Sequence, residues 1–143
     1  MGVEDIKRDF PNLENKSYDP PHSEEDFNYN CLAFVLGDRA NWWEPGAFGH
    51  YWPPGFSKDT SIATAISILR LHGFVIEAEI FSTLDAESVA IYGKGDEWVD
   101  FAKFNDGKWW SKLGDGHDIW HSTLKELEGD LYGKVAKILS RKA

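Results

Sequence analysis

Residues 30–36 read Asn-Cys-Leu-Ala-Phe-Val-Leu, and the fold prediction starts from the helix that this segment indicates. Asn30 is a favourable N-cap because its side-chain oxygen can accept a backbone N–H of the first helical turn. We therefore expect a short helix from Cys31 to about Gly37. Cys31 is the only cysteine of the chain, and at the first helical position the helix dipole would favour its thiolate. Alternatively, Cys31 is a small buried hydrophobic residue, the commoner situation for a lone cysteine in an apolar run.

The segments that follow predict a loop, a second helix and several short strands. Residues 41–56 are rich in aromatic residues, proline and glycine, which resist both helix and regular strand, so an ordered loop is expected. Residues 60–72 place apolar side chains on one helical face, and Gly73 is a suitable C-cap. Runs with strand character come next, and the last two should form a hairpin. These runs cover residues 74–81, 88–92, 97–104 and 108–113.

A closing helix is expected near the C-terminus. Thr123, with Glu126 three residues later, has the pattern of a capping box. Beyond it the apolar residues recur at a spacing that favours a helix. They are Tyr132, Val135, Ile138 and Leu139.

The order of these elements predicts an α+β domain, with N-terminal helices packed on one face of an antiparallel sheet and a closing C-terminal helix. A chain of 143 residues suits a single domain. We expect that domain over residues 31–143. Residues 1–30 are polar, contain proline and lack a hydrophobic period, so they predict an extended N-terminal arm.

The charge of the chain restricts its partners. Twenty-four Asp and Glu against fifteen Lys and Arg give a formal net charge of −9. This charge repels phosphate backbones and argues against nucleic acid, whereas it favours a basic protein as the partner. The first thirty residues lack the basic start and apolar core of a secretory signal, and no apolar run approaches the length of a membrane span. A soluble, cytoplasmic protein without a membrane partner is therefore expected.

Asp100 is out of pattern in its expected strand. Alternation over residues 97–104 places Asp100 on the same face as Trp98, Ala102 and Phe104. A solvated position at the sheet edge would explain a carboxylate there. If Asp100 is buried instead, it needs a partner, and by residue type the nearest candidates are Lys112 and His121.

Separate motifs of the chain, over roughly residues 28–141, resemble in order an uncharacterised bacterial domain-of-unknown-function family. They are Asn30-Cys31-Leu32-Ala33, Tyr51-Trp52-Pro53-Pro54-Gly55, Val89-Ala90-Ile91-Tyr92, Trp110-Ser111-Lys112-Leu113-Gly114, Asp118-Ile119-Trp120-His121 and Glu128-Gly129-Asp130-Leu131-Tyr132-Gly133. That family is itself similar to the NlpC-type and papain-like thiol hydrolases. The resemblance implies a papain-like α+β fold, with Cys31 at the site and a histidine on a central strand. The position that would carry this histidine is Asp100.

An aspartate cannot replace imidazole as a base near neutral pH unless its pKa is strongly raised, and it cannot stabilise a thiolate as a cation would. We therefore expect a catalytically degraded papain-like domain that acts as a binding or immunity-type module. The alternative is a cysteine-dependent amide or thioester hydrolase that uses Cys31, with Asp100 and His121 as the other candidate catalytic residues. Seven tryptophans could also form a sugar-binding platform, although core and loop packing accounts for them more simply.

His117 and His121 stand four residues apart with Asp118 between them, which superficially resembles a helical zinc motif. Glycines directly before His117 oppose a helix there, and no third ligand has a suitable spacing. We therefore expect neither a metal nor another cofactor. His121 is interpreted as a hydrogen-bonding strut, or as a base that reaches Cys31 by an unusual route.

Overall fold

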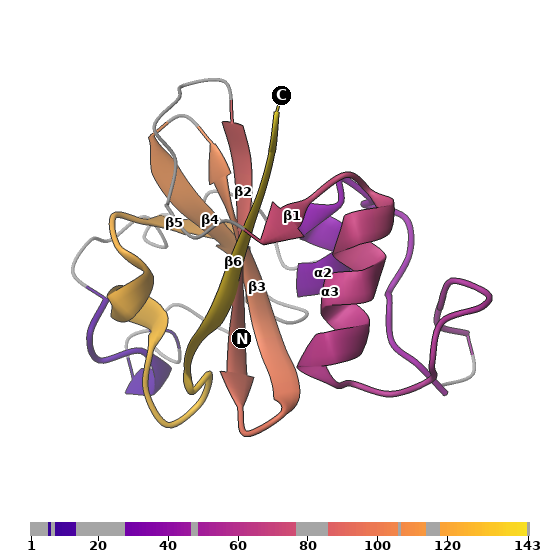
Figure 1. Cartoon of the computed structure of the whole chain (residues 1–143). Coiled ribbons are helices and arrows are strands. Elements are labelled where there is room, and N and C mark those ends of the chain that lie inside the picture. The colour runs from indigo at the N-terminus through magenta and orange to yellow at the C-terminus, as the bar shows by residue number, and fades with distance from the viewer. Residues whose placement is uncertain are drawn as a thin grey trace.

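The chain is built around a six-stranded antiparallel sheet with the order β1-β6-β2-β3-β4-β5 (Figure 1). The structure is a computed structural model that describes residues 6, 8–13, 28–46, 49–76, 86–105, 107–113 and 118–142. The strands are β1 (Val75–Ile76), β2 (Ala86–Lys94), β3 (Glu97–Asn105), β4 (Lys108–Lys112), β5 (Asp118–His121) and β6 (Lys134–Lys142). The helices are α2 (Cys31–Val35), α3 (Ile62–Leu71) and the 3-10 helix η1 (Leu124–Leu127).

The expected papain-like α+β fold is wrong for this chain. The structure is mostly one antiparallel sheet, and α2 and α3 are short. The prediction of a closing C-terminal helix is also wrong, because the C-terminal segment forms the strand β6, which lies between β1 and β2 within the sheet. The capping-box contact exists, since the Thr123 backbone N–H donates to the Glu126 carboxylate (3.0 Å), but it opens only the short helix η1.

A β-bulge explains the helix-like pattern of the C-terminal segment. In the register of β6 with β2, Ala136 is an extra residue without a partner on β2. The bulge interrupts the alternation, so Val135 and Ile138 pack against the same core cluster although they are three residues apart. Three-residue spacing is typical of a helix, and the sequence pattern is therefore misleading at this point.

Both predicted helices near the N-terminus are present. The Asn30 side chain accepts the Ala33 N–H (3.2 Å) and caps α2, which begins at Cys31. The Ser61 hydroxyl accepts the Thr64 N–H (3.1 Å) and caps α3 in the same way. Gly73 follows α3 with φ +92°, a left-handed conformation that glycine adopts without strain. The predicted hairpin of β3 and β4 is confirmed too.

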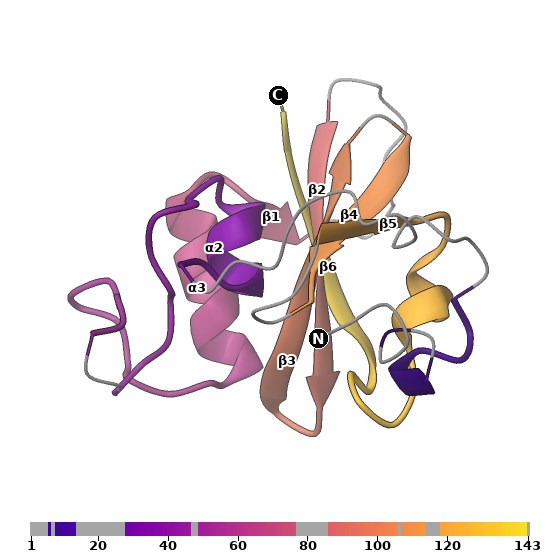
Figure 2. The same cartoon turned by 180° about the vertical axis from the view of Figure 1, so that it is seen from behind.

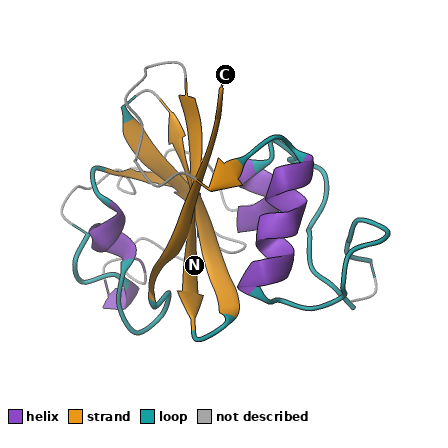
Figure 3. Cartoon of the chain, viewed as in Figure 1, coloured by secondary structure: helices purple, strands orange, loops and turns teal. Residues whose placement is uncertain are grey.

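The sheet has a hydrophobic cluster on each face. Helices α2 and α3 lie on one side, whereas η1 and the described N-terminal residues lie on the other (Figures 1, 2 and 3). The helix-side cluster includes Leu32, Phe34, Ala65, Ile68, Leu69, Val89, Ile91, Phe101 and Leu139. The opposite cluster, which we call the arm-side cluster, includes Ile6, Phe10, Leu13, Ala90, Tyr92, Ala102, Trp109, Ile119, Leu127 and Tyr132.

The expected N-terminal arm contributes to this core. Ile6, Phe10 and Leu13 are buried in the arm-side cluster. Most other residues of the arm lie outside the described part of the chain, so the division into residues 1–30 and 31–143 stays a prediction. Within the described residues, no helix has the length and apolar character that a membrane crossing requires.

Candidate functional site

Asn30 organises the start of α2. Its side-chain oxygen accepts both the Ala33 N–H and the Trp43 N–H, each at 3.2 Å, and its amide nitrogen donates to the Trp43 carbonyl at 2.8 Å. Asn30 is buried, so these hydrogen bonds are shielded from water. The sequence predicts the cap, whereas the tie to residues 41–56, which we call the aromatic loop, is visible only in the structure. The same side chain therefore fixes Cys31 and the aromatic loop relative to each other.

Cys31 lies at the first position of α2 with 6% of its surface exposed. Burial is the main cause that raises the pKa of its thiol, and the charge of the neighbouring Asp100 carboxyl raises it further. The backbone N–H groups of Phe101 and Leu32 act in the opposite direction but do not offset these effects. The thiol form of Cys31 is therefore favoured over the nucleophilic thiolate.

Asp100 is buried as well, with 1% of its surface exposed. Neither of its carboxyl oxygens has a well-aligned hydrogen-bond partner within the described residues. The Phe101 N–H and the Cys31 thiol lie close enough to favour the charged form weakly, but burial outweighs them and raises the pKa of Asp100. The protonated acid is favoured, so this pair consists of a thiol and a carboxylic acid rather than a nucleophile and a base.

Two tyrosines extend this buried pair. Tyr132 has a raised pKa, because of burial first and then the charges of Asp100 and Cys31. The pKa of Tyr92 is raised by burial and by Asp100 too, and its hydroxyl donates to the Leu124 carbonyl at 2.6 Å. Sequence analysis missed both tyrosines as neighbours of the site. The signal was weak: Tyr92 and Tyr132 fall in two of the family motifs, far apart along the chain.

His121 is engaged elsewhere. Its Nδ1 lies 2.9 Å from the Thr123 carbonyl, and its Nε2 lies 3.0 Å from the Ser111 hydroxyl. Burial lowers the pKa of His121, so we assign the neutral ring that donates from Nδ1 and accepts at Nε2. The hydrogen bonds of both ring nitrogens are therefore with Ser111 and Thr123 rather than with Cys31. His121 acts here as a hydrogen-bonding strut between β4 and the start of η1.

Of the two histidines whose spacing superficially resembles a zinc motif, His117 lies outside the described residues. Among the residues that are described, no group of three or more His, Cys, Asp and Glu side chains is arranged to hold a metal ion.

Lys112, a candidate partner for Asp100, belongs to a different cluster. It is fully buried, and its ammonium lies 4.8 Å from the centre of the Tyr29 ring. The Tyr29 hydroxyl donates to the Asp118 carboxylate at 3.2 Å, and Asp118 is the residue directly opposite Lys112 in the register of β4 with β5. Arg39 approaches Asp118 at 3.6 Å from the surface. Lys112 thus lies among Tyr29, Asp118 and Arg39, and within the described residues no cation contributes to the pKa shift of Asp100.

The fold and the site define a sheet protein with a buried thiol–carboxyl pair in which both pKa values are raised. The chain belongs to a family described as a domain of unknown function (DUF7689), whose model matches residues 21–140. Comparison with curated proteins and with solved structures found no match. Membership of a family of unknown function is thereby confirmed, and the match adds nothing on the likeness to thiol hydrolases.

Proposed function

We propose that this domain is a non-catalytic binding module whose partner is a basic protein, as immunity-type proteins bind their targets. The observation that carries the proposal is the contact of Cys31 with Asp100. A thiol hydrolase needs a thiolate and a base that accepts its proton. Here the group beside the thiol is a buried carboxyl, and both pKa values are raised. Binding, unlike hydrolysis, requires neither group to ionise.

An exposed acidic surface supports the proposed partner. Asp59, Asp96 and Glu97 are exposed at the tip of the β2–β3 hairpin and beside the start of α3. The Ile62 N–H donates to the Asp96 carbonyl (2.8 Å), and the Thr60 hydroxyl donates to Glu97 (3.2 Å), so the two segments are held together. We call these three carboxylates the acidic tip. In a chain with a net charge of −9, the acidic tip would attract a cationic protein with a salt-sensitive association rate.

The aromatic loop has mainly a structural role in this proposal. Trp43 is 7% exposed, and its indole N–H donates to the Asp38 carboxylate at 2.9 Å. Trp52 and Phe56 also pack against the helix-side cluster. Tyr51 is 40% exposed and is held edge-on against Trp43, with the ring centres 4.7 Å apart. Of this loop, Tyr51 is therefore the aromatic side chain that we assign to partner contact.

A cysteine-dependent amide or thioester hydrolase is the second candidate. It is favoured by the position of Cys31 at the capped start of α2, beside a titratable side chain. A hydrolase would need a reactive thiolate near neutral pH, whereas the binding module needs none. The reactivity of Cys31 against pH therefore separates the two candidates.

Affinity capture tests the binding proposal. We would immobilise the chain, the acidic-tip variant Asp96→Asn/Glu97→Gln, and the control variant Asp9→Asn/Asp130→Asn, which removes equal charge outside the acidic tip and outside residues 41–56. The expected result is a basic protein that is retained stoichiometrically, dissociates in salt, and is lost with the acidic-tip variant alone. No stoichiometric basic partner, or equal retention by all three proteins, would contradict the proposal.

A further inference from the structure

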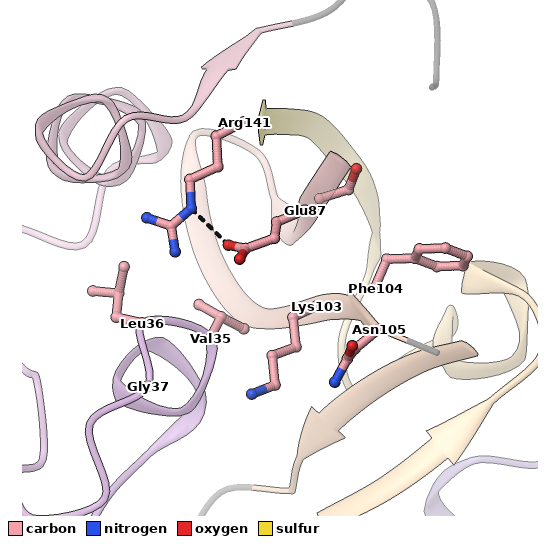
Figure 4. Close-up of a pocket in the computed structure, with 9 residues that line it drawn as sticks. Val35, Leu36, Gly37, Glu87, Lys103, Phe104, Asn105 and Arg141 are labelled. Carbon is pink, nitrogen blue, oxygen red and sulfur yellow. Dashed lines mark hydrogen bonds and ion pairs between the residues drawn. The ribbon is translucent and has the colours of Figure 1, made fainter. Parts of the chain in front are cut away.

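A cavity lies at the opposite end of α2 from Cys31, between that helix and strands β2, β3 and β6 (Figure 4). Its volume is about 230 Å³. This exceeds the engineered cavity of about 150 Å³ that holds benzene and falls below the roughly 300–1,000 Å³ of drug-sized pockets. The cavity therefore suits a ligand of about the size of a substituted benzene. Val35 and Leu36 form an apolar wall, and the polar side chains come from the three strands.

Arg141 and Glu87 form a balanced pair at one side of this cavity. The Arg141 Nε donates to the Glu87 carboxylate at 2.6 Å, and Nη1 donates to the His72 carbonyl at 2.6 Å. The guanidinium also lies 4.3 Å from the centre of the Phe74 ring. These contacts fix Arg141 and neutralise Glu87, so the pair contributes shape and little net charge.

Lys103 contributes a positive charge that this pair does not balance. Within the described residues, no carboxylate forms an ion pair with its ammonium, which lies 4.4 Å from the centre of the Phe34 ring. The side chain is about half-buried, and this burial is the main cause that lowers the pKa of Lys103. Asn105 lines the same cavity, and in Figure 4 the Lys103 and Asn105 side chains both point away from the Arg141–Glu87 pair. Lys103 and Asn105 thus offer adjacent donors to an acceptor.

We propose that this cavity binds a small organic monocarboxylate. The carboxylate group would accept hydrogen bonds from Lys103 and Asn105, and the apolar body would lie against Val35 and Leu36. One negative charge balances the charge of Lys103, whereas a dianion would leave an unbalanced charge in a partly buried space. This site is independent of the acidic tip and of the proposed protein partner, so either proposal can fail alone.

Titration with benzoate, followed by backbone amide NMR, tests the site in the unaltered chain. Benzoate is expected to bind saturably, and the changes in backbone amide chemical shift should be concentrated at residues 35–37, 87–88, 103–105 and 141. Benzamide has the same shape without the charge and should bind at least about tenfold more weakly. Inorganic phosphate, which is largely a dianion at slightly alkaline pH, should bind no more tightly than benzoate. Absence of saturable benzoate shifts, equal binding of benzamide, or tighter binding of phosphate would overturn the proposal.

Two matched lysine variants test whether the Lys103 ammonium is the charge that binds the carboxylate of benzoate. Lys103→Met removes the charge but keeps a long, unbranched side chain, and it should weaken benzoate binding by about tenfold or more. Lys108→Met is the control, because the Lys108 ammonium also lies over an aromatic ring, 4.6 Å from the centre of Trp120, but outside the cavity. This control should bind benzoate as the unaltered chain does. Equal weakening in both variants, or unchanged binding by a folded Lys103→Met protein, would show that Lys103 is not the anchor.

Discussion

The Asp100 carboxyl lies beside the Cys31 thiol in the interior of the protein, and its charge adds to burial in raising the pKa of that thiol. A helix start favours a thiolate, but α2 is only five residues long and its N-terminal dipole meets a desolvated, acidic neighbour. Burial therefore determines the protonation state of Cys31. The predictions below follow from this pair and from the hydrogen bonds that hold it.

Asp100→Asn is expected to stabilise the protein near neutral pH by about 1–3 kcal/mol, because it removes a buried group that resists ionisation. The pKa of Asp100 is raised in the folded state, so the folded chain keeps a proton that the unfolded chain releases. Stability is therefore lost as pH rises above about 4, the ordinary aspartate pKa. This loss of stability with rising pH should be absent in Asp100→Asn. Urea unfolding at several pH values measures the free energy of unfolding of both proteins and its pH dependence. The exposed-site control Asp96→Asn should keep the pH dependence; if Asp100→Asn keeps it as well, the Asp100 carboxyl is not its source.

Asp100→His should activate the thiol. An imidazolium beside Cys31 would favour the thiolate, which the Asp100 carboxyl disfavours. We expect labelling by iodoacetamide near neutral pH to be at least about tenfold faster than in Asp100→Asn, where the neighbour is neutral. Equal labelling rates in the two folded variants would mean that the side chain at this position does not control Cys31.

Asn30→Ala should cost more than the loss of an ordinary cap. Removing an N-cap costs about 1 kcal/mol, and this side chain also makes two hydrogen bonds with the Trp43 backbone. We expect a loss of about 2–3 kcal/mol in the free energy of unfolding, against about 1 kcal/mol for the α3 cap variant Ser61→Ala. Urea unfolding of both proteins checks the difference. Equal losses would show that the tie to Trp43 contributes nothing.

His121 should make the protein less stable in mild acid. Its pKa is lowered in the folded state, so below about pH 6.5 the unfolded chain binds a proton that the folded chain does not. Stability is then lost as pH falls through that range, by an amount of order 1 kcal/mol. This dependence is opposite in sign to that of Asp100, and His121→Gln should remove it selectively. If the free energy of unfolding of His121→Gln falls in acid as it does in the unaltered chain, His121 is not the neutral hydrogen-bonded residue that we assign.

Local signals made part of the fold predictable. The Asn30 cap, the periodic face of α3 and the turn residues between β3 and β4 act within a few residues, and these elements formed where expected. The strand β6 was not predictable, because the bulge at Ala136 depends on its pairing with β2. A second bulge, at Val99, breaks the alternation expected around Asp100.

The candidate site was predictable only in outline. Its side chains come from segments that are distant in the sequence, and burial depends on all of them. The cap and the out-of-pattern carboxyl pointed to Cys31 and Asp100, but nothing local indicated that Asp100 acts on the pKa values of Tyr92 and Tyr132. The pairing of His121 with Ser111 likewise required the β4–β5 register. The functional roles of Cys31, Asp100 and His121 stay proposals.

The most direct test of the central claim is the rate of iodoacetamide labelling of Cys31 as a function of pH. Cys31 is the only cysteine, so the mass of the intact protein reports its labelling without ambiguity. Because the pKa of the thiol is raised, we predict slow labelling at neutral pH, with a rate that climbs only above the ordinary thiol range near about pH 8.5. Rapid labelling of the folded protein below about pH 6.5 would contradict this account and favour the hydrolase.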